Sequence, residues 1–392
     1  MTVCAFIIRP EPEPTFRVGG LGLIERWQKS LSAHGVKDVE VLTRGELPLR
    51  LRQAAGPVVL AFGDWVAEHL ALEAFVEQAG TIAPGTLRTL TVEGNPTPLP
   101  VLVLSADIAA RAAELDPSAY VDASRFIAEL TRVVNPKLDP SSVYEGYFEK
   151  ITEKEVAKTA SFRLLQRLRW RPGGLVAKYL NRPISIRLSY LLLDTKVTPN
   201  QTTIFAFLVG AIGIVFVFLG GYQNTIIGTA LMQANSVIDG IDGELARIRH
   251  QNSEYGAYLD SVCDEILNAA LMFSVGYNLT TYVHHNPLYL ILGAFAGGVS
   301  FFYASVHWHC KAKHGLGFYW WFEAYKPRRE VQRSTSTWSY LKKLTMKESY
   351  LFLFLLAAIF GGLEALLWIF AGVGVLVVVL FTIHIPIKRA RW

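Results

Sequence analysis

Apolar runs long enough to enter a bilayer appear only after Thr198. Four aspartates lie in one polar stretch between two of these runs. The stretch reads DGIDGELARIRHQNSEYGAYLDSVCDE. An ionisable side chain at membrane depth costs on the order of 3 kcal/mol or more, so it normally faces a polar cavity, a partner or a metal ion. The stretch is therefore the candidate functional centre.

The spacing of the aspartates predicts two carboxylate pairs. Asp239 and Asp242 are three residues apart, and Asp260 and Asp264 are four apart, so on two helices each pair projects from one face. Gly256 lies one helical turn before Asp260, where the missing Cβ lets a ligand or a second helix approach. Two such faces together would make an oxygen-rich metal site.

Arg247 adds a cation to the same stretch. Its planar guanidinium suits phosphate oxygens. Hard divalent cations held by carboxylates, Mg²⁺ above all, commonly carry phosphate ligands in their remaining positions. The composition of the stretch therefore indicates a phosphorylated substrate.

The pattern D-x-x-D-G-x-x-A-R, eight residues, then G-x-x-x-D-x-x-x-D resembles the signature of the CDP-alcohol phosphotransferases. All its fixed positions are matched, by Asp239, Asp242, Gly243, Ala246, Arg247, Gly256, Asp260 and Asp264. The resemblance covers about residues 175 to 388. It includes NRPIS and TPNQTT, which are similar to the segments leading into that family's first membrane helix.

The resemblance implies a displacement at phosphorus, in which an acceptor hydroxyl attacks the β-phosphate of a CDP-alcohol and CMP leaves. It implies that Asp239, Asp242 and Asp260 ligate Mg²⁺ or Mn²⁺, with two ions expected, and that Asp264 is a ligand or the general base. The substrate-binding residues implied are Gly243, Ala246, Arg247, Gly256, Asn200 and Thr203. The donor alcohol and the acceptor, an alcohol or a polyol phosphate, stay open.

Three other interpretations compete with this one. The aspartates could cap helices or form structural ion pairs with Arg247, but that explains neither four carboxylates nor their register with the glycines. They could carry ions in a transporter, although the chain has no second copy of the motif. The protein could also be a catalytically silent membrane scaffold that presents its N-terminal domain to a partner. The intact set of aspartates argues against this, because a protein that had lost the chemistry could replace these costly carboxylates.

The chain is expected to have three parts. Its 392 residues are 51% hydrophobic and 18% charged, which is typical of a protein that is partly soluble and partly in a membrane. We expect a cytosolic α/β domain at 1–150, a linker with an amphipathic interfacial helix at 151–197, and a six-helix membrane domain at 198–392. The opening MTVCAFIIRPEPEP lacks the basic start and apolar core of a cleavable signal.

Six transmembrane helices are predicted from counting toward about 20 apolar residues per span. They are placed at about 203–221, 224–249, 256–280, 288–310, 347–361 and 363–386. The fifth run is short and is expected to extend through LTMKES. Gly361 and Gly362 are expected to form the turn before the sixth helix.

Basic residues predict the orientation, because they favour the cytoplasmic side. The loop after the fourth predicted helix is rich in them, whereas TYVHHNP has no Lys or Arg; the loop carries Lys311, Lys313, Lys326, Arg328, Arg329, Arg333, Lys342, Lys343 and Lys347. We therefore expect an integral protein of the cytoplasmic membrane with the aspartates and both termini facing the cytosol. Of the loop residues, Lys311, Lys313, Arg328 and Arg329 could bind an acidic acceptor, or could be anchors alone.

The net charge of +5 is explained by these membrane-flanking residues, so no nucleic acid partner is expected. A lipid bilayer is. A homodimer is implied by the family resemblance, and GAFAGG in the fourth helix could allow close helix contact.

The N-terminal part alternates apolar strands (VCAFII, VEVLT, PVVLAF, PVLVLS) with helical stretches (GLIERWQKSLSAHG, WVAEHLALEAFVEQAG), which predicts a mostly parallel α/β sheet. Residues 18–43 and AFGD at 61–64 are similar to nucleotidyltransferases, with Asp64 like their metal-binding aspartate. Fusions of an inositol-phosphate cytidylyltransferase to a di-inositol-phosphate-phosphate synthase have this domain order.

Two departures from those enzymes predict a degenerate domain. Their Gly-rich loop, whose backbone N–H groups hold phosphates, is replaced by IIRPEPEPTF, in which prolines remove donors and glutamates repel phosphate. Lys150 falls about where their second metal carboxylate would be. We expect a regulatory, docking or stabilising module without nucleotidyltransferase activity.

Overall fold

The computed structural model describes residues 3–12, 14–68, 72, 75–76, 78–92, 99–143, 147–169, 173–314 and 346–389. The chain divides into two compact units. The first contains Met1–Leu168, Leu193–Thr195 and Arg247–His250, and the second contains Arg169–Leu192, Lys196–Ala246 and Gln251–Trp392.

The first unit is built on a six-stranded sheet of order β4-β1-β5-β8-β7-β9. Its strands are β1 (Cys4–Ile8), β4 (Asp38–Leu42), β5 (Val58–Phe62), β7 (Thr86–Val92), β8 (Val101–Leu104) and β9 (Lys137–Val143). Three of the five pairings are parallel, and β8 runs antiparallel to both of its neighbours. The α/β sheet predicted for this part of the chain is confirmed, with all four predicted strands in it.

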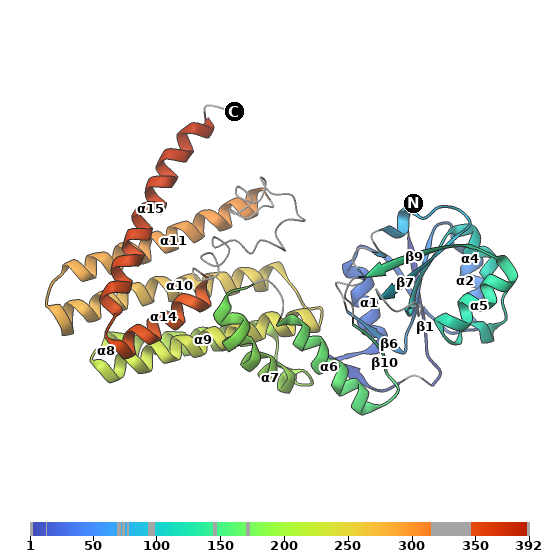
Figure 1. The fold of residues 1–392 in the computed structure, drawn as a ribbon, viewed down its shortest axis with the longest axis horizontal. Coiled ribbons are helices and arrows are strands. Elements are labelled where there is room, and N and C mark those ends of the chain that lie inside the picture. Colours follow the sequence, from blue (N-terminus) through green and yellow to red (C-terminus); the bar gives the residue numbers. More distant parts are fainter. Residues whose placement is uncertain are drawn as a thin grey trace. The chain divides into compact units, whose positions relative to one another are not determined.

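Helices cover both faces of this sheet, as Figure 1 shows. On one side lie α2 (Leu47–Gln53), α4 (Ala106–Ala112) and α5 (Ala123–Val134), and on the other lies α1 (Leu23–Ala33). Alternate residues of β1 point to opposite faces of the sheet. Phe6 and Ile8 pack on the side of α2, α4 and α5, whereas Ala5 and Ile7 pack on the side of α1. The strands are apolar on both faces because both are buried.

Two short antiparallel pairs stand apart from the main sheet. They join β2 (Arg17–Val18) to β3 (Leu21–Gly22), and β6 (Trp65–Ala67) to β10 (Phe148–Lys150). The helix expected to begin at Trp65 is therefore wrong at its start, because WVA is a strand held by hydrogen bonds from a segment more than 80 residues later, which local patterning cannot reveal. Two 3₁₀ turns, Gln78–Thr81 and Pro117–Val121, complete this part of the fold.

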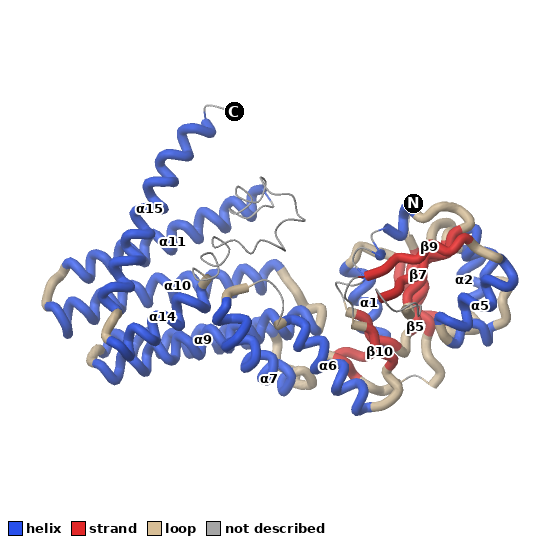
Figure 2. The backbone as a smooth tube through the Cα atoms, viewed as in Figure 1, coloured by secondary structure: helices blue, strands red, loops and turns tan. Residues whose placement is uncertain are grey.

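The second unit is helical (Figure 2). Its long helices are α8 (Pro199–Leu219), α9 (Tyr222–Ile248), α10 (Glu254–Asn278), α11 (Leu288–His314), α14 (Lys347–Phe360) and α15 (Leu363–Arg389). Within the described residues they match the six helices predicted from the apolar runs. Helix α10 packs against α8 and α11, and α11 against α15.

The segment expected to be a linker and interfacial helix is largely helical. It contains α6 (Lys154–Leu168), a π-helical turn at Ala177–Asn181 and α7 (Arg182–Leu192). On α7, Ile184, Leu188 and Leu191 are exposed whereas Ser185 and Ser189 are buried. An exposed apolar stripe on a short basic helix is typical of a helix that lies on a membrane surface.

Local sequence explains where several helices begin and end. Thr198 and Gln201 form a reciprocal capping box at the start of α8, with Pro199 in the first helical position. Gly361, at φ +78°, ends α14 in the left-handed conformation that favours glycine, so the predicted turn at Gly361 and Gly362 is confirmed.

Helix α14 is shorter than predicted. Met346 is its N-cap, with extended backbone, so the helix begins at Lys347 and takes up only the last three residues of LTMKES; Leu344 and Thr345 lie outside the described residues. Its 14 residues reach about 21 Å at the standard helical rise of about 1.5 Å. That is less than the ~30 Å hydrocarbon core of a bilayer.

Helix α8 exposes most of its large apolar side chains and buries mainly small or polar ones, together with Ile214 and Val217. Its exposed face carries Ile204, Phe205, Leu208, Ile212, Val215 and Leu219, and its buried face carries Thr202, Thr203, Ala206, Gly210 and Gly213. Among the described helices α8 alone is long and apolar enough to cross a membrane, with a mean hydropathy of 2.6 over its most apolar window. The other five predicted spans are helices that do not meet this standard.

Glycines bring neighbouring helices into backbone contact in this unit. A Cβ at Gly276 of α10 would lie 2.5 Å from the carbonyl oxygen of Tyr289 and 3.0 Å from the Cα of Gly293 in α11. A Cβ at Gly297 would lie 2.7 Å from the carbonyl oxygen of Ala269. Gly293 and Gly297 of the GAFAGG segment thus pack inside the chain, and only Gly298 of its glycines has open space around it.

The close approach at Gly276 predicts a stability effect. We expect Gly276→Ala to lower the free energy of unfolding by about 1–3 kcal/mol, because the new methyl group meets backbone that cannot rotate away. Gly298→Ala is the matched control, since a Cβ there has nothing within 4 Å and gains helix propensity. Thermal unfolding of both variants in detergent checks this, and equal midpoints would contradict it.

Candidate functional site

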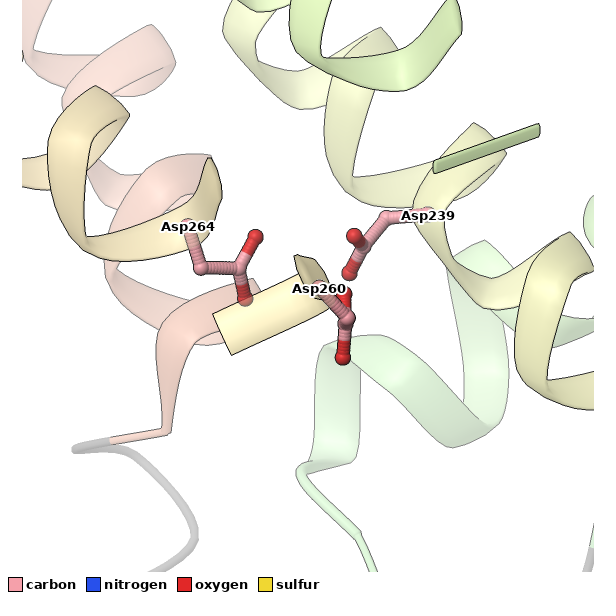
Figure 3. A group of neighbouring side chains, drawn as sticks. All are labelled: Asp239, Asp260 and Asp264. Carbon is pink, nitrogen blue, oxygen red and sulfur yellow. The ribbon is translucent and has the colours of Figure 1, made fainter. Parts of the chain in front are cut away.

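Helices α9 and α10 carry the four aspartates of the sequence motif. Asp239 and Asp242 project from α9, and Asp260 and Asp264 project from α10. The carboxylates of Asp239, Asp260 and Asp264 converge, with one oxygen from each lying within 4.8 Å of the others. Figure 3 shows these three side chains turned toward one another.

Asp242 lies beside this group rather than in it. It is buried, its Oδ2 accepts a hydrogen bond from the Thr203 hydroxyl of α8, and its Oδ1 accepts one from the backbone N–H of Gly243. Asp242 still interacts electrostatically with two members of the group, since the charge of Asp239 acts on Asp242 and that of Asp242 acts on Asp260. The structure thus brings three of the four predicted ligands together and ties the fourth to α8.

Lys347 is the residue that the sequence interpretation missed, because it was grouped with the basic loop. Its ammonium lies 3.1 Å from Asp239 Oδ2 and also donates to Asp264 Oδ1. One signal could have singled it out. A lysine in the first turn of a helix opposes the helix dipole, so it needs a nearby negative partner.

The three carboxylates fit a divalent cation. Asp260 Oδ1 is buried and has no hydrogen-bond partner among the described residues. Among the described residues, Lys347 forms ion pairs with two of the three carboxylates, those of Asp239 and Asp264. Oxygen-only ligands are those that Mg²⁺ and Mn²⁺ prefer.

The remaining predicted substrate residues lie on α8, α9 and α10. Gly243 and Ala246 lie on α9, and Asn200 lies in the first turn of α8. A Cβ at Gly256 would stand 3.0 Å from Asn200 Oδ1, so this glycine lets the start of α10 approach α8. Arg247 lies in the last turn of α9, among the residues that belong to the first unit.

The predicted acceptor-binding side chains lie outside the described part of the structure. Lys311 and Lys313 lie near the end of α11, and their side chains are outside the described part of the structure, as are Arg328 and Arg329 entirely. Their proposed role in acceptor binding stays a prediction.

The nucleotidyltransferase-like part has a lysine beside its one expected metal ligand. Pairing of β6 with β10 brings Lys150 Nζ within 3.2 Å of Asp64 Oδ2. An ammonium beside a single carboxylate satisfies its charge and repels a cation. These residues do not fit a divalent metal centre.

Comparison with known proteins identifies the helical part of the chain. Residues 196–379 match the family model of the CDP-alcohol phosphatidyltransferases. This part of the chain therefore matches the CDP-alcohol phosphatidyltransferases, as the motif predicted, and that family consists of metal-dependent transferases of phosphate groups.

Several curated proteins are similar to parts of this chain. The chain is similar to the "Bifunctional IPC transferase and DIPP synthase" of Aquifex aeolicus, 34% identical over 36% of this chain and 32% of the relative. It is also similar to the protein of that name from Archaeoglobus fulgidus, 25% identical over 66% of this chain and 61% of the relative. An "Archaetidylinositol phosphate synthase" of Pyrococcus horikoshii is 32% identical over 23% of this chain and 46% of its own. The matched segments thus span less than two thirds of each relative.

Proposed function

We propose that this protein moves a substituted phosphoryl group from a CDP-alcohol to the hydroxyl of an acceptor alcohol, with release of CMP. The observation that carries the proposal is the convergence of Asp239, Asp260 and Asp264 within a CDP-alcohol phosphatidyltransferase domain. Within the described part of the chain, structural ion pairing alone does not account for this group, because Lys347 pairs with only Asp239 and Asp264 and the buried Asp260 Oδ1 has no hydrogen-bond partner there.

Each group has a defined task in this reaction. A Mg²⁺ or Mn²⁺ ion held by the three carboxylates would supply positive charge to the diphosphate oxygens of the donor. Asp264 takes the proton from the acceptor hydroxyl. The acceptor oxygen forms a bond to the β-phosphorus, and the bond from that phosphorus to the bridging oxygen breaks, so CMP leaves with the bridging oxygen.

The substrates are proposed from chemistry and from the relatives. The names of three relatives refer to an archaetidylinositol phosphate synthase or to IPC and DIPP. We propose that an inositol or a related polyol phosphate is one reactant. The other is either the diacylglycerol-type lipid of a CDP-activated donor or a second soluble polyol.

We propose that the six helices of the second unit lie in the cytoplasmic membrane, with the aspartates and both termini facing the cytosol. The support is the outward-facing apolar surface of α8, together with exposed Phe301 on α11 and Trp368, Ile369 and Val373 on α15. A soluble protein rarely exposes a continuous apolar face of this kind. Association into a homodimer is a further proposal that follows the family resemblance.

The decisive experiment measures CMP release by the detergent-purified protein. Donors are CDP-diacylglycerol and CDP-inositol, and acceptors are inositol, inositol phosphate and glycerol phosphate, each with Mg²⁺, with Mn²⁺ or with EDTA. Release that requires donor, acceptor and metal supports the proposal and identifies the alcohols. No release from any pair, or cation flux in liposomes without CMP, would favour the silent scaffold or the transporter.

We further propose that the N-terminal domain has no nucleotidyltransferase activity and serves as a regulatory, docking or stabilising module. The support is the Lys150–Asp64 ion pair and the prolines at Pro10, Pro12 and Pro14 where backbone donors would be needed.

This predicts that the full-length protein releases no pyrophosphate from CTP and inositol phosphate above the level of a buffer blank. Pyrophosphate release measured with Mg²⁺ and with Mn²⁺ checks this. CTP-dependent release that disappears in Asp64→Asn would contradict it.

A further inference from the structure

A row of buried polar side chains joins the segment 177–192 to one face of the catalytic helix α9. At one end, Gln233 Nε2 donates to Asn181 Oδ1 at 2.8 Å, and Asn181 Nδ2 donates to Ser236 Oγ at 3.0 Å. At the other end, the hydroxyls of Ser185 and Ser189 each donate to a different oxygen of Glu244 at 2.6 Å. These four hydrogen bonds are called the polar ladder below.

The spacing of the ladder residues fits two helices that lie against each other. Asn181, Ser185 and Ser189 recur every fourth residue, so they form one stripe along the segment. On α9 the stripe consists of Gln233, Ser236, Gly240 and Glu244. At Gly240 the two helices approach closely, because a Cβ there would lie 3.3 Å from Ser185 Oγ.

The ladder is deeply buried. Asn181, Ser185, Ser189, Ser236 and Glu244 are all at most 4% exposed. A buried polar group without partners is strongly unfavourable, and a buried carboxylate more so. Any rotation or sliding of α9 that separated Glu244 from its two serines would leave such groups unpaired. The ladder therefore specifies one rotation and one axial position of α9 relative to α7.

The rotation of α9 determines where the metal-binding carboxylate of Asp239 points. Successive residues on a helix are about 100° apart, so Asp239 is about 100° around α9 from Gly240 at the centre of the ladder. A carboxylate about 6 Å from the helix axis moves by about 1 Å when the helix turns by about 10°. The carboxylate of Asp239 must lie close to those of Asp260 and Asp264 on α10. A displacement of this size would therefore move it away from the other two.

We propose that Glu244, Ser185 and Ser189 are positioning residues for phosphoryl transfer, acting by fixing the rotation of α9 and hence the place of Asp239. The inference rests on the proposed function, because it assigns these residues to the same site. Their hydrogen bonds join α7 to α9, so they act on the aspartates through the helix. Nothing in the signature pattern of the family includes them, since Glu244 stands at one of its variable positions.

The test distinguishes the effect of side-chain length at residue 244 from the effect of side-chain charge. Glu244→Gln keeps the length of the side chain and can still hydrogen-bond both serines, whereas Glu244→Asp keeps the charge but is one methylene shorter. We expect Glu244→Gln to keep kcat for CMP release within about tenfold of wild type. Glu244→Asp and the double variant Ser185→Ala/Ser189→Ala should lose on the order of 10²-fold, the cost of about 1 Å of misplacement.

Two further measurements complete the experiment on the full-length protein in detergent. Titration with Mn²⁺ followed by electron paramagnetic resonance gives the affinity of the aspartates for metal, and we expect a loss of about tenfold or more in the same two weakened variants. Ser274→Ala is the matched control, since Ser274 is equally buried but donates only to Leu271 of its own helix. It should stay within about twofold of wild type.

The outcomes are distinct. If Glu244→Asp is as active as wild type while Glu244→Gln is not, the charge matters and the positioning role is overturned. If the variants match wild type in kcat and Mn²⁺ affinity, the ladder has no role in the site and the inference is again overturned. If wild type binds Mn²⁺ but releases no CMP with any substrate pair, the proposed function fails, while the loss of Mn²⁺ affinity in the variants still supports the ladder. Failure of wild type both to bind Mn²⁺ and to release CMP overturns both.

Discussion

Asp264→Asn is expected to lower the rate of CMP release by about 10²–10⁴-fold, the usual contribution of a positioned general base. The amide is nearly isosteric with the carboxylate but cannot accept the proton from the acceptor hydroxyl. It also removes one of the three negative charges that converge at the site. Steady-state CMP release under saturating donor, acceptor and Mg²⁺ measures the effect, and KM for the donor should change much less than kcat.

The control for Asp264→Asn removes the charge of a carboxylate on the same helix that lies outside the group of three aspartates. Glu254 lies in the first turn of α10 and is exposed, so Glu254→Gln should keep kcat within about twofold of wild type. Retention of a tenth or more of the activity by Asp264→Asn would contradict the role assigned to Asp264. Equal losses in both variants would instead point to an effect on α10 as a whole.

Lys347→Met is expected to produce the second large effect, on stability without metal. The ammonium of Lys347 contacts Asp239 and Asp264, and all three side chains are less than a quarter exposed. Removing one partner of such a buried group leaves its carboxylates uncompensated, which costs about 3–5 kcal/mol. We therefore expect a lower thermal midpoint in EDTA for Lys347→Met than for wild type.

Metal should reverse much of this loss. Lys347 and a cation compete for the same carboxylate oxygens, so Mn²⁺ should raise the midpoint of Lys347→Met more than that of wild type. Lys196→Met is the control, because Lys196 is exposed in the same unit. It should leave both the midpoint in EDTA and the Mn²⁺ shift within experimental error of wild type. An equal Mn²⁺ shift in wild type and Lys347→Met would show that the lysine does not share the metal-binding oxygens.

The predicted secondary structure was most accurate where the pattern was local. The six long helices follow the apolar runs, and the end of α14 follows Gly361, because both depend on residues adjacent in the chain. The start of the helix predicted at Trp65 was wrong, since that segment pairs with Phe148–Lys150. Strand pairing over such a distance in sequence leaves no local periodicity.

The glycines of α11 make the same point about packing. GAFAGG in the sequence indicates a surface for close helix contact without naming the partner. The structure places Gly293 and Gly297 against α10 of the same chain. The pattern specifies that backbones approach, whereas the connections between helices determine which ones do.

The sequence by itself determined the class of chemistry here, because four aspartates, their spacing and the glycines between them are local features of two adjacent helices. Only the tertiary structure decided which carboxylates converge, since Asp242 is drawn to Thr203 of α8 while Asp239, Asp260 and Asp264 meet across α9 and α10. It also brought Lys347, 83 residues beyond Asp264, into the site, and Ser185 and Ser189 to Glu244. These partners are set by helix packing, in which the distance along the chain has no bearing on the distance in space.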